Sequence, residues 1–207
     1  MELRVITHPD FYDGEAEQIN AMLKDGLGLI HIRKPKWTYD QIMSLLEEIH
    51  EFYHEHVVIH QMHDMGKEFG LAGVHLKSTE RDRMNDEQLD EWLSQWKERG
   101  CKVSTAIHNM DEFDRFYSRF NLLTVSPVFE SIMKPGYRSE IDWLRILKDR
   151  ELSKVMAIGG VSVDTIRHIA KLNFGACGAM GAIWKEGIPF ENYKKLKNIC
   201  EQEVHSS

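Results

Sequence analysis

Eight short apolar segments recur along this chain, and most of them are separated by sequence of helical length and pattern. Continuous apolar runs are typical of strands that are covered on both faces, as in a parallel sheet. Eight strand–helix repeats predict a closed (β/α)8 barrel, the α/β fold of the TIM-barrel type, whose chemistry lies where the strands end. In chain order, the segments end at or before His8, His31, His60, His75, His108, Pro127, the Gly159-Gly160 pair and Gly181.

Amphipathic sequence between the apolar segments predicts the helices of these repeats. The clearest helix covers residues 38–53, where apolar residues recur at helical spacing and Thr38 with Gln41 matches a capping box. Another helix is capped by Asn85 or Asp86 and ends at Gly100. The remaining expected helices cover residues 15–24, 64–69, 110–120, 141–147, 163–172 and 191–203.

The chain length fits one barrel without large insertions. The sequence has 207 residues, of which 42% are apolar and 29% are charged. A (β/α)8 barrel usually has about 250 residues, and about 200 is near the minimum. No linker or low-complexity tract interrupts the repeats. We therefore expect residues 1–207 to form one compact barrel domain.

Charge and cysteine content restrict the partners and the compartment. The formal net charge of −7 argues against a nucleic-acid-binding surface. No apolar stretch approaches the roughly 18 residues of a membrane span, and residues 1–4 lead straight into a strand, which leaves no room for a signal peptide. The three cysteines, Cys101, Cys177 and Cys200, form no disulfide framework. We expect a cytoplasmic protein without nucleic-acid or membrane partners; a homo-oligomer is compatible with the sequence, which leaves the oligomeric state open.

Glycines follow the last two expected strands. Gly159 and Gly160 come after the seventh strand, and Gly181 with Ala182 comes after the eighth. Such turns free backbone N–H groups to approach an anion, and barrels commonly bind a substrate phosphate after strands 7 and 8. The alternative is that the glycines serve tight turns for geometry alone. The pattern favours a phosphate site.

Two basic residues are expected at the same mouth. Alternation along the second strand sends His31 and Arg33 to one face, towards the lumen, where an arginine needs an anion such as a diphosphate. The long segment after the sixth strand carries Ser131 and Lys134 three residues apart, which suits a mobile loop beside a phosphate. The alternative for this segment is a surface loop whose Lys134 is solvated.

Oxygen ligands for a metal are sparse. Glu80, Gln61 and Asp64 could bind Mg²⁺, which keeps most of its waters and takes one or two carboxylates together with phosphate. With one strong carboxylate near the fourth strand, the prediction is a weak site on Glu80 and Gln61. The segment His60-Gln61-Met62-His63-Asp64 has no usual zinc spacing, so we expect most of the histidines to be polar lining or satisfied hydrogen-bond donors.

At these residues the chain resembles the thiamine phosphate synthase and thiazole tautomerase family over almost its whole length. The resemblance implies a barrel enzyme, a transferase, that joins a hydroxymethylpyrimidine diphosphate to a thiazole phosphate and releases thiamine phosphate and diphosphate. It also implies magnesium as the cofactor and phosphorylated small molecules as the partners. The matching pieces are Ile30-His31-Ile32-Arg33, Gly73-Val74-His75-Leu76, His108 with the acidic helix that follows it, Ser126-Pro127-Val128-Phe129, Lys134-Pro135-Gly136, Ala157-Ile158-Gly159-Gly160, and residues 178–183.

The resemblance assigns roles by position. Arg33 and Lys134 would hold the diphosphate and act in catalysis. The metal ligands would fall at Gln61, where the synthase pattern has aspartate, and at Glu80, which can still coordinate. The synthase pattern has glutamine where His31 stands and lysine where Pro35 stands, with Lys34 and Lys36 flanking that position. Substrate-binding positions would be His31, His60, Ser131, Gly159, Gly160, Gly181 and Ala182.

The sequence also allows functions other than that of a synthase. A thiazole tautomerase-like isomerase shares the His-Ile-Arg segment at residues 31–33, but its proton-transfer histidine stands where this chain has Pro127. That activity would need His31, His60 or His108 as acid and base. A non-catalytic binder of thiamine intermediates and a different phosphate-handling barrel enzyme are also compatible with these residues.

Overall fold

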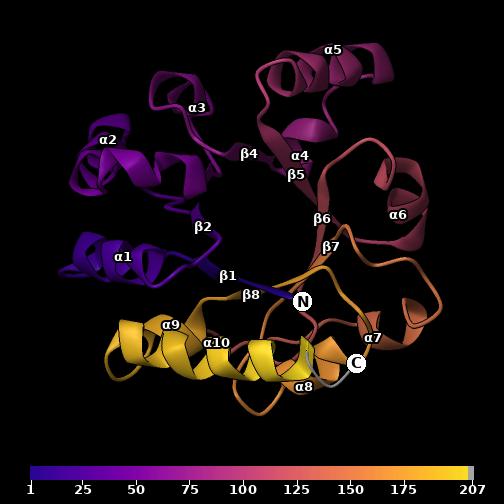
Figure 1. The fold of residues 1–207 in the computed structure, drawn as a ribbon. Coiled ribbons are helices and arrows are strands. Elements are labelled where there is room, and N and C mark those ends of the chain that lie inside the picture. Colours follow the sequence, from indigo (N-terminus) through magenta and orange to yellow (C-terminus); the bar gives the residue numbers. More distant parts are fainter. Residues whose placement is uncertain (205–207) are drawn as a thin grey trace.

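The eight strands pair side by side in chain order and close on themselves, because β1 pairs with both β2 and β8 (Figure 1). All pairings are parallel, which confirms the expected (β/α)8 barrel. The computed structural model describes residues 1–204, so residues 205–207 of the expected domain lie outside the described residues. The strands are β1 Glu2–Ile6, β2 Leu29–Ile32, β3 Val57–Ile59, β4 Gly73–Leu76, β5 Lys102–Ile107, β6 Leu122–Val125, β7 Val155–Ile158 and β8 Ala176–Ala179.

The helices surround this ring of strands (Figure 1). No helix among residues 1–204 is both long enough and apolar enough to span a membrane. The helices are α1 Glu15–Lys24, α2 Tyr39–Glu48, the 3-10 helix η1 Glu51–His56, α3 Asp64–Glu68, α4 Ser78–Arg81, α5 Asp86–Lys97, α6 Met110–Phe116, α7 Trp143–Ile146, α8 Ile166–Ala170, α9 Gly181–Trp184 and α10 Pro189–Val204.

Side chains of alternate strand residues enter two different environments. Val5, Ile30 and Ile32 belong to the large core between strands and helices. Leu122, Met156 and Ala176 form a separate small cluster, which we assign to the lumen from the alternation along each strand. Because both faces are covered, the strands are buried almost throughout, as their continuous apolar sequence predicts.

The expected helix over residues 38–53 is wrong in its last five residues, 49–53. The capping box of Thr38 and Gln41 is present, but α2 ends at Glu48, and Ile49 is extended. The buried ring of His54 explains the break, because its Nε2 lies 3.0 Å from the carbonyl oxygen of Leu46 and 3.2 Å from that of Ile49. A side chain thus satisfies carbonyls that a longer helix would have bonded.

A buried ion pair links the end of β2 to α1. The ammonium of Lys34 contacts the carboxylate of Glu15 and also donates to the carbonyl oxygen of Asp10 at 2.9 Å. Both charged side chains are almost fully buried, at 0% and 3% exposure. The other carboxylate oxygen of Glu15 accepts the backbone N–H of His8 at 3.0 Å. The charge of Lys34 is therefore used within the fold.

Removing one partner of this pair leaves the other charge buried and unpaired. We expect Glu15→Ala to lower the free energy of unfolding by about 3–5 kcal/mol. Glu17→Ala is the matched control, because Glu17 is exposed in the same first turn of α1 and should cost less than about 0.5 kcal/mol. Urea denaturation of the two variants measures the difference. Equal stability of both variants would contradict the assignment.

Candidate active site

Three histidines on neighbouring strands lie together inside the barrel. His31 Nδ1 lies 3.0 Å from His60 Nε2, the rings of His60 and His75 stack with centroids 4.2 Å apart, and His75 Nδ1 lies 2.9 Å from Ser104 Oγ. All three rings are buried. Because His31 comes from β2, His60 directly follows β3 and His75 comes from β4, one polar row crosses a lumen that apolar side chains usually fill.

Burial keeps this row uncharged. Desolvation lowers the pKa of His31 and of His60 well below the usual value, and it lowers the pKa of His75 to about 3. The Nε2 atom of His31 is buried and has no hydrogen-bond partner among the described residues. The structure therefore places the histidines beneath the strand ends as neutral groups. Substrate contacts by His31 and His60 stay a prediction, and His60 is slightly nearer to solvent, at 6% exposure against 0%.

The neutral histidines make stability depend on pH. The unfolded chain protonates histidine below about pH 6.5, whereas the folded chain resists protonation of His75 down to about pH 3. Stability should therefore be complete above pH 6.5 and fall as the pH is lowered, by at most about 1.4 kcal/mol per pH unit for each histidine. Urea unfolding at pH 7.5 and pH 5 measures this slope. His75→Asn should reduce the dependence of the unfolding free energy on pH by the contribution of one histidine. An unchanged slope would show that the buried histidines do not cause the pH dependence.

Arg33 lies above this row at the end of β2. Its side chain has no hydrogen bond or ion pair among residues 1–204, although its backbone N–H donates to Thr7 Oγ1 at 2.9 Å. Its charge helps to lower the pKa of His60 and His75, so the guanidinium is close to both rings. Partial burial lowers the pKa of Arg33 itself. The mouth of the barrel thus carries an exposed cation without an acidic partner among the described residues.

The two lysines near Arg33 are not available in the same way. Lys34 is paired with Glu15 inside the fold, and Lys36 is highly exposed, with its Nζ 3.5 Å from Asp10 Oδ1. The synthase pattern has a lysine where this chain has Pro35, and neither Lys34 nor Lys36 replaces that lysine. Arg33 is the basic residue of this segment that the structure leaves for a ligand.

The segment after β6 forms a loop with its own internal bonds. Ser131 Oγ accepts the backbone N–H of Lys134 at 3.1 Å. The carboxylate of Glu130 accepts the N–H of Gly136 at 2.8 Å and forms an ion pair with Arg138. The side chain of Lys134 is exposed and has no partner within the described part of the chain. Its expected contact with a diphosphate stays a prediction.

This loop packs directly on both glycine turns. Gly159 and Gly160 have positive φ angles of 94° and 66°, and a Cβ on Gly160 would lie 2.4 Å from the carbonyl oxygen of Glu130. A Cβ on Gly181 would lie 2.7 Å from Cβ of Ile132. The structure therefore brings Ser131 and Lys134 into the same loop that covers both turns. Close packing is a sufficient reason for glycine here, and the phosphate contact of these turns stays a prediction.

The two expected metal ligands differ in their surroundings. Gln61 donates from Nε2 to the carbonyl oxygen of Lys34, while its Oε1 is buried and has no hydrogen-bond partner among the described residues. Glu80 lies half-buried on α4, with Oε1 3.6 Å from Lys77 Nζ. No group of three or more His, Cys, Asp or Glu side chains in residues 1–204 could hold a metal ion. Of the three possible oxygen ligands, Gln61 thus offers an amide oxygen and Glu80 a carboxylate, while Asp64 is highly exposed, with Oδ1 3.4 Å from Lys67 Nζ.

Sequence analysis predicted Glu80 but missed the short helix α4 that carries it, and with it Ser78 and Arg81. Ser78 Oγ lies 3.0 Å from Nε2 of His108, so the turns after β4 and β5 contact each other. Four residues are too few for helical periodicity, and a serine after a strand gives no distinct signal. The exposed ring of His108 contrasts with the buried rings of His31 and His60.

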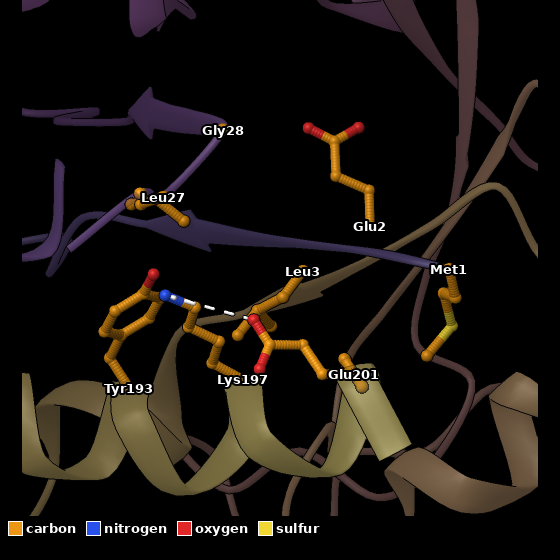
Figure 2. Close-up of a pocket in the computed structure, with 10 residues that line it drawn as sticks. Met1, Glu2, Leu3, Leu27, Gly28, Tyr193, Lys197 and Glu201 are labelled. Atoms are coloured by element: carbon orange, nitrogen blue, oxygen red, sulfur yellow. Dashed lines mark ion pairs between the residues drawn. The ribbon is translucent and has the colours of Figure 1, made fainter. Parts of the chain in front are cut away.

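A cavity of about 230 Å³ lies at the opposite end of the barrel, where the strands begin (Figure 2). Glu2, Leu3 and Gly28 line it from β1 and the approach to β2, and Tyr193 and Lys197 line it from α10. The Nζ of Lys197 lies 2.8 Å from Asp25 Oδ2 and 4.0 Å from Glu201 Oε1. Active sites of this fold lie at the other end, where the strands finish, so we place the candidate site at the mouth around Arg33.

Comparison with known proteins agrees with this architecture. Thiamine phosphate pyrophosphorylase from Bacteroides thetaiotaomicron is 26% identical, with a TM-score of 0.78 over 98% of this chain and 99% of that chain. The pyrophosphorylase from Pyrococcus furiosus is 16% identical, with a TM-score of 0.77 over 98% and 96%. A 3-hexulose-6-phosphate synthase from Salmonella typhimurium, 17% identical with a TM-score of 0.71 over 98% and 100%, shares the fold.

No curated protein sequence matches the chain. The model of the thiamine monophosphate synthase family matches residues 3–183, which include all the strands except Glu2 of β1, and all candidate site residues; α10 lies outside the match. The match covers far more than half of the chain. The chain therefore belongs to the thiamine monophosphate synthase family.

Proposed function

We propose that this chain is a transferase of thiamine biosynthesis. It couples hydroxymethylpyrimidine diphosphate with thiazole phosphate and releases thiamine phosphate and diphosphate. Family membership and the likeness to the Bacteroides pyrophosphorylase support this activity. The observation that carries it is Arg33, an exposed cation at the mouth with no acidic partner among the described residues. A diphosphate supplies the bidentate oxygens that such a guanidinium binds best.

The charge of each residue at the site indicates its role in this reaction. Breaking the bond between the pyrimidine methylene and the diphosphate leaves negative charge on the departing group, which Arg33 stabilises and Lys134 approaches from the β6 loop. The thiazole nitrogen then forms the new bond to the pyrimidine methylene. The neutral histidines His31 and His60 line the site without adding charge. Ser131, Gly159, Gly160, Gly181 and Ala182 surround the thiazole phosphate.

Gln61 and Glu80 fit a magnesium ion that arrives with its substrate. The buried, unpartnered Oε1 of Gln61 and the carboxylate of Glu80 are oxygen donors of the kind that Mg²⁺ takes, but they provide one negative charge between them. When bound, the ion supplies positive charge to the diphosphate oxygens. We infer a weak site that is completed by the substrate, and a cytoplasmic enzyme, in keeping with the free thiols of its cysteines.

One observation favours a second candidate, a thiazole tautomerase-like isomerase. Pro127 cannot move a proton, and His31 and His60 are buried, so His108 is the substitute with access to a substrate. Its Nε2 is held by Ser78 at 3.0 Å, in the position of an oriented acid and base. This candidate needs no diphosphate and no metal.

Purified protein mixed with both coupling substrates and Mg²⁺ tests the proposed function. We expect thiamine phosphate, and we expect Arg33→Ala to lower kcat/KM by roughly 10–150-fold, the loss of a charge-assisted bidentate contact. Lys36→Ala is the control and should change little, because Lys36 is highly exposed. Melting temperature should be similar in all three proteins. Conversion of the thiazole tautomer alone would favour the isomerase, and ligand-induced stabilisation without product would favour a binder.

The altered metal ligand predicts a gain of function. We expect Gln61→Asp to lower the Mg²⁺ concentration that gives half-maximal activity, because the second carboxylate adds the charge that the site lacks. Titration of activity with Mg²⁺ compares the variant with the parent protein. Calorimetry should show weak Mg²⁺ binding to the free protein and stronger binding with diphosphate present. Tight binding to the free protein that Glu80→Ala abolishes would refute the idea of a substrate-borne ion.

A further inference from the structure

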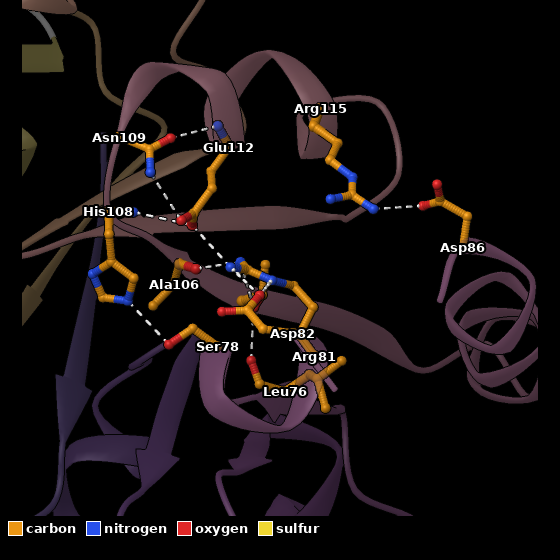
Figure 3. A network of polar contacts seen from close by, with 11 residues as sticks. Leu76, Ser78, Arg81, Asp82, Asp86, Ala106, His108, Asn109, Glu112 and Arg115 are labelled. Carbon is orange, nitrogen blue, oxygen red and sulfur yellow. Dashed lines mark hydrogen bonds and ion pairs between the residues drawn. The ribbon is translucent and has the colours of Figure 1, made fainter. Parts of the chain in front are cut away.

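Arg81, the last residue of α4, is buried although it is charged. Its side chain is 1% exposed. Its Nη1 donates to the carbonyl oxygen of Ala106 at 2.6 Å, its Nη2 lies 2.8 Å from Glu112 Oε2, and its Nε donates to Asp82 at 2.9 Å (Figure 3). The guanidinium also lies 4.2 Å from the ring centroid of Phe116. One side chain thus joins the turn after β4 to the end of β5 and to α6.

Glu112 extends this contact to the next turn of the barrel. Its Oε2, which receives Arg81, also accepts the backbone N–H of His108 at 3.2 Å, and its Oε1 accepts the side-chain N–H of Asn109 at 3.1 Å. The carboxylate therefore fixes the backbone at the point where His108 leaves β5. Figure 3 shows His108 on one side of this carboxylate and Arg81 on the other.

A second contact closes the link at the surface. The ring of His108 lies 3.0 Å from Ser78 Oγ, at the start of α4. Helix α4 has four residues, too few to be stable by itself, so its position depends on what holds its two ends. Ser78 holds the first end through His108, and Arg81 holds the last end through Glu112. Glu80 lies between them.

We propose that Arg81, with Glu112, is a positioning residue that fixes Glu80 and His108 at the mouth of the barrel. The proposal rests on the proposed function, since Glu80 is a metal ligand of that function, while His108 is the acid and base of the second candidate. A purely structural role is a poor explanation, because a buried ion pair often contributes no more stability than apolar residues of similar size. What the pair does provide is direction, because guanidinium and carboxylate have fixed bonding geometry.

Conservative variants separate positioning from stability. Arg81→Lys keeps the charge and loses the fork of donors, and Glu112→Gln keeps the shape and loses the charge. Arg115→Lys is the matched control, because Arg115 comes from the same α6, lies 5.1 Å from the same Phe116 ring and pairs with Asp86 at 2.9 Å on the exposed side (Figure 3). Ser78→Ala removes the hydroxyl that contacts the His108 ring, and it therefore provides the reference NMR signal of a ring without this contact.

Two measurements read the position directly. Calorimetry with Mg²⁺ and inorganic diphosphate should show affinity weakened by roughly tenfold in Arg81→Lys and Glu112→Gln, as for other residues that orient a metal ligand. Arg115→Lys should remain within about twofold of the parent protein, a change as small as its exposed ion pair. In nitrogen NMR, the signals of the His108 ring in Arg81→Lys and in Glu112→Gln should shift towards those of Ser78→Ala. The signals in Arg115→Lys should stay at the positions of the parent protein.

The outcomes distinguish this proposal from the function on which it rests. Lower urea stability of Arg81→Lys and Glu112→Gln with unchanged Mg²⁺–diphosphate affinity and an unmoved His108 signal would overturn it. If the parent protein neither binds Mg²⁺–diphosphate nor makes product, the proposed function fails. The His108 signal then decides the positioning role by itself, because that signal requires no substrate.

Discussion

Closure of the barrel is the constraint on which the rest of the structure depends. The pairing of β1 with β8 leaves no open edge, and it brings the ends of all strands to one rim. Residues that are far apart in sequence, such as Arg33, Glu80 and Gly160, therefore surround one opening. The same closure makes a lumen, and in this chain part of that lumen is polar. The candidate site lies directly above this polar part.

The polar row inside the barrel is tolerated because its members satisfy one another. His31, His60 and His75 stay neutral, so the cost of burial is that of uncharged rings and not of charges. Contacts along the row and to Ser104 give a partner to three of the six ring nitrogens. Neutral rings beneath Arg33 leave the guanidinium as the dominant charge above them. The chemistry that we propose for the rim is therefore anion binding over an uncharged polar surface.

Much of this architecture could be predicted from the sequence. Continuous apolar runs of short length indicate strands that are buried on both faces, and the count and spacing of these runs leave little choice of fold. The short helices α4 and α9 and the break after Glu48 could not be predicted. Tertiary hydrogen bonds decide them, such as the bond of His54 to the carbonyl oxygen of Leu46 in α2, and no local sequence pattern indicates such bonds.

The candidate site could also be predicted only in part. Alternation along β2 could place His31 and Arg33 on one face, because that depends on the strand period alone. The partners of each side chain could not be predicted, since they come from other strands: His31 meets His60, and the β6 loop covers both glycine turns.

Arg33 and Lys34 show how one step along a strand end separates structure from function. Both are basic, but Lys34 is fully buried and needs a negative charge nearby, whereas Arg33 is exposed at the mouth. The alternation sends Lys34 outward to α1, where Glu15 supplies that charge from within the chain. It sends Arg33 to the rim, where no residue of the described chain does so. A fold that provides for one of two adjacent cations leaves the other for a ligand, and a diphosphate has the charge and the shape to bind it.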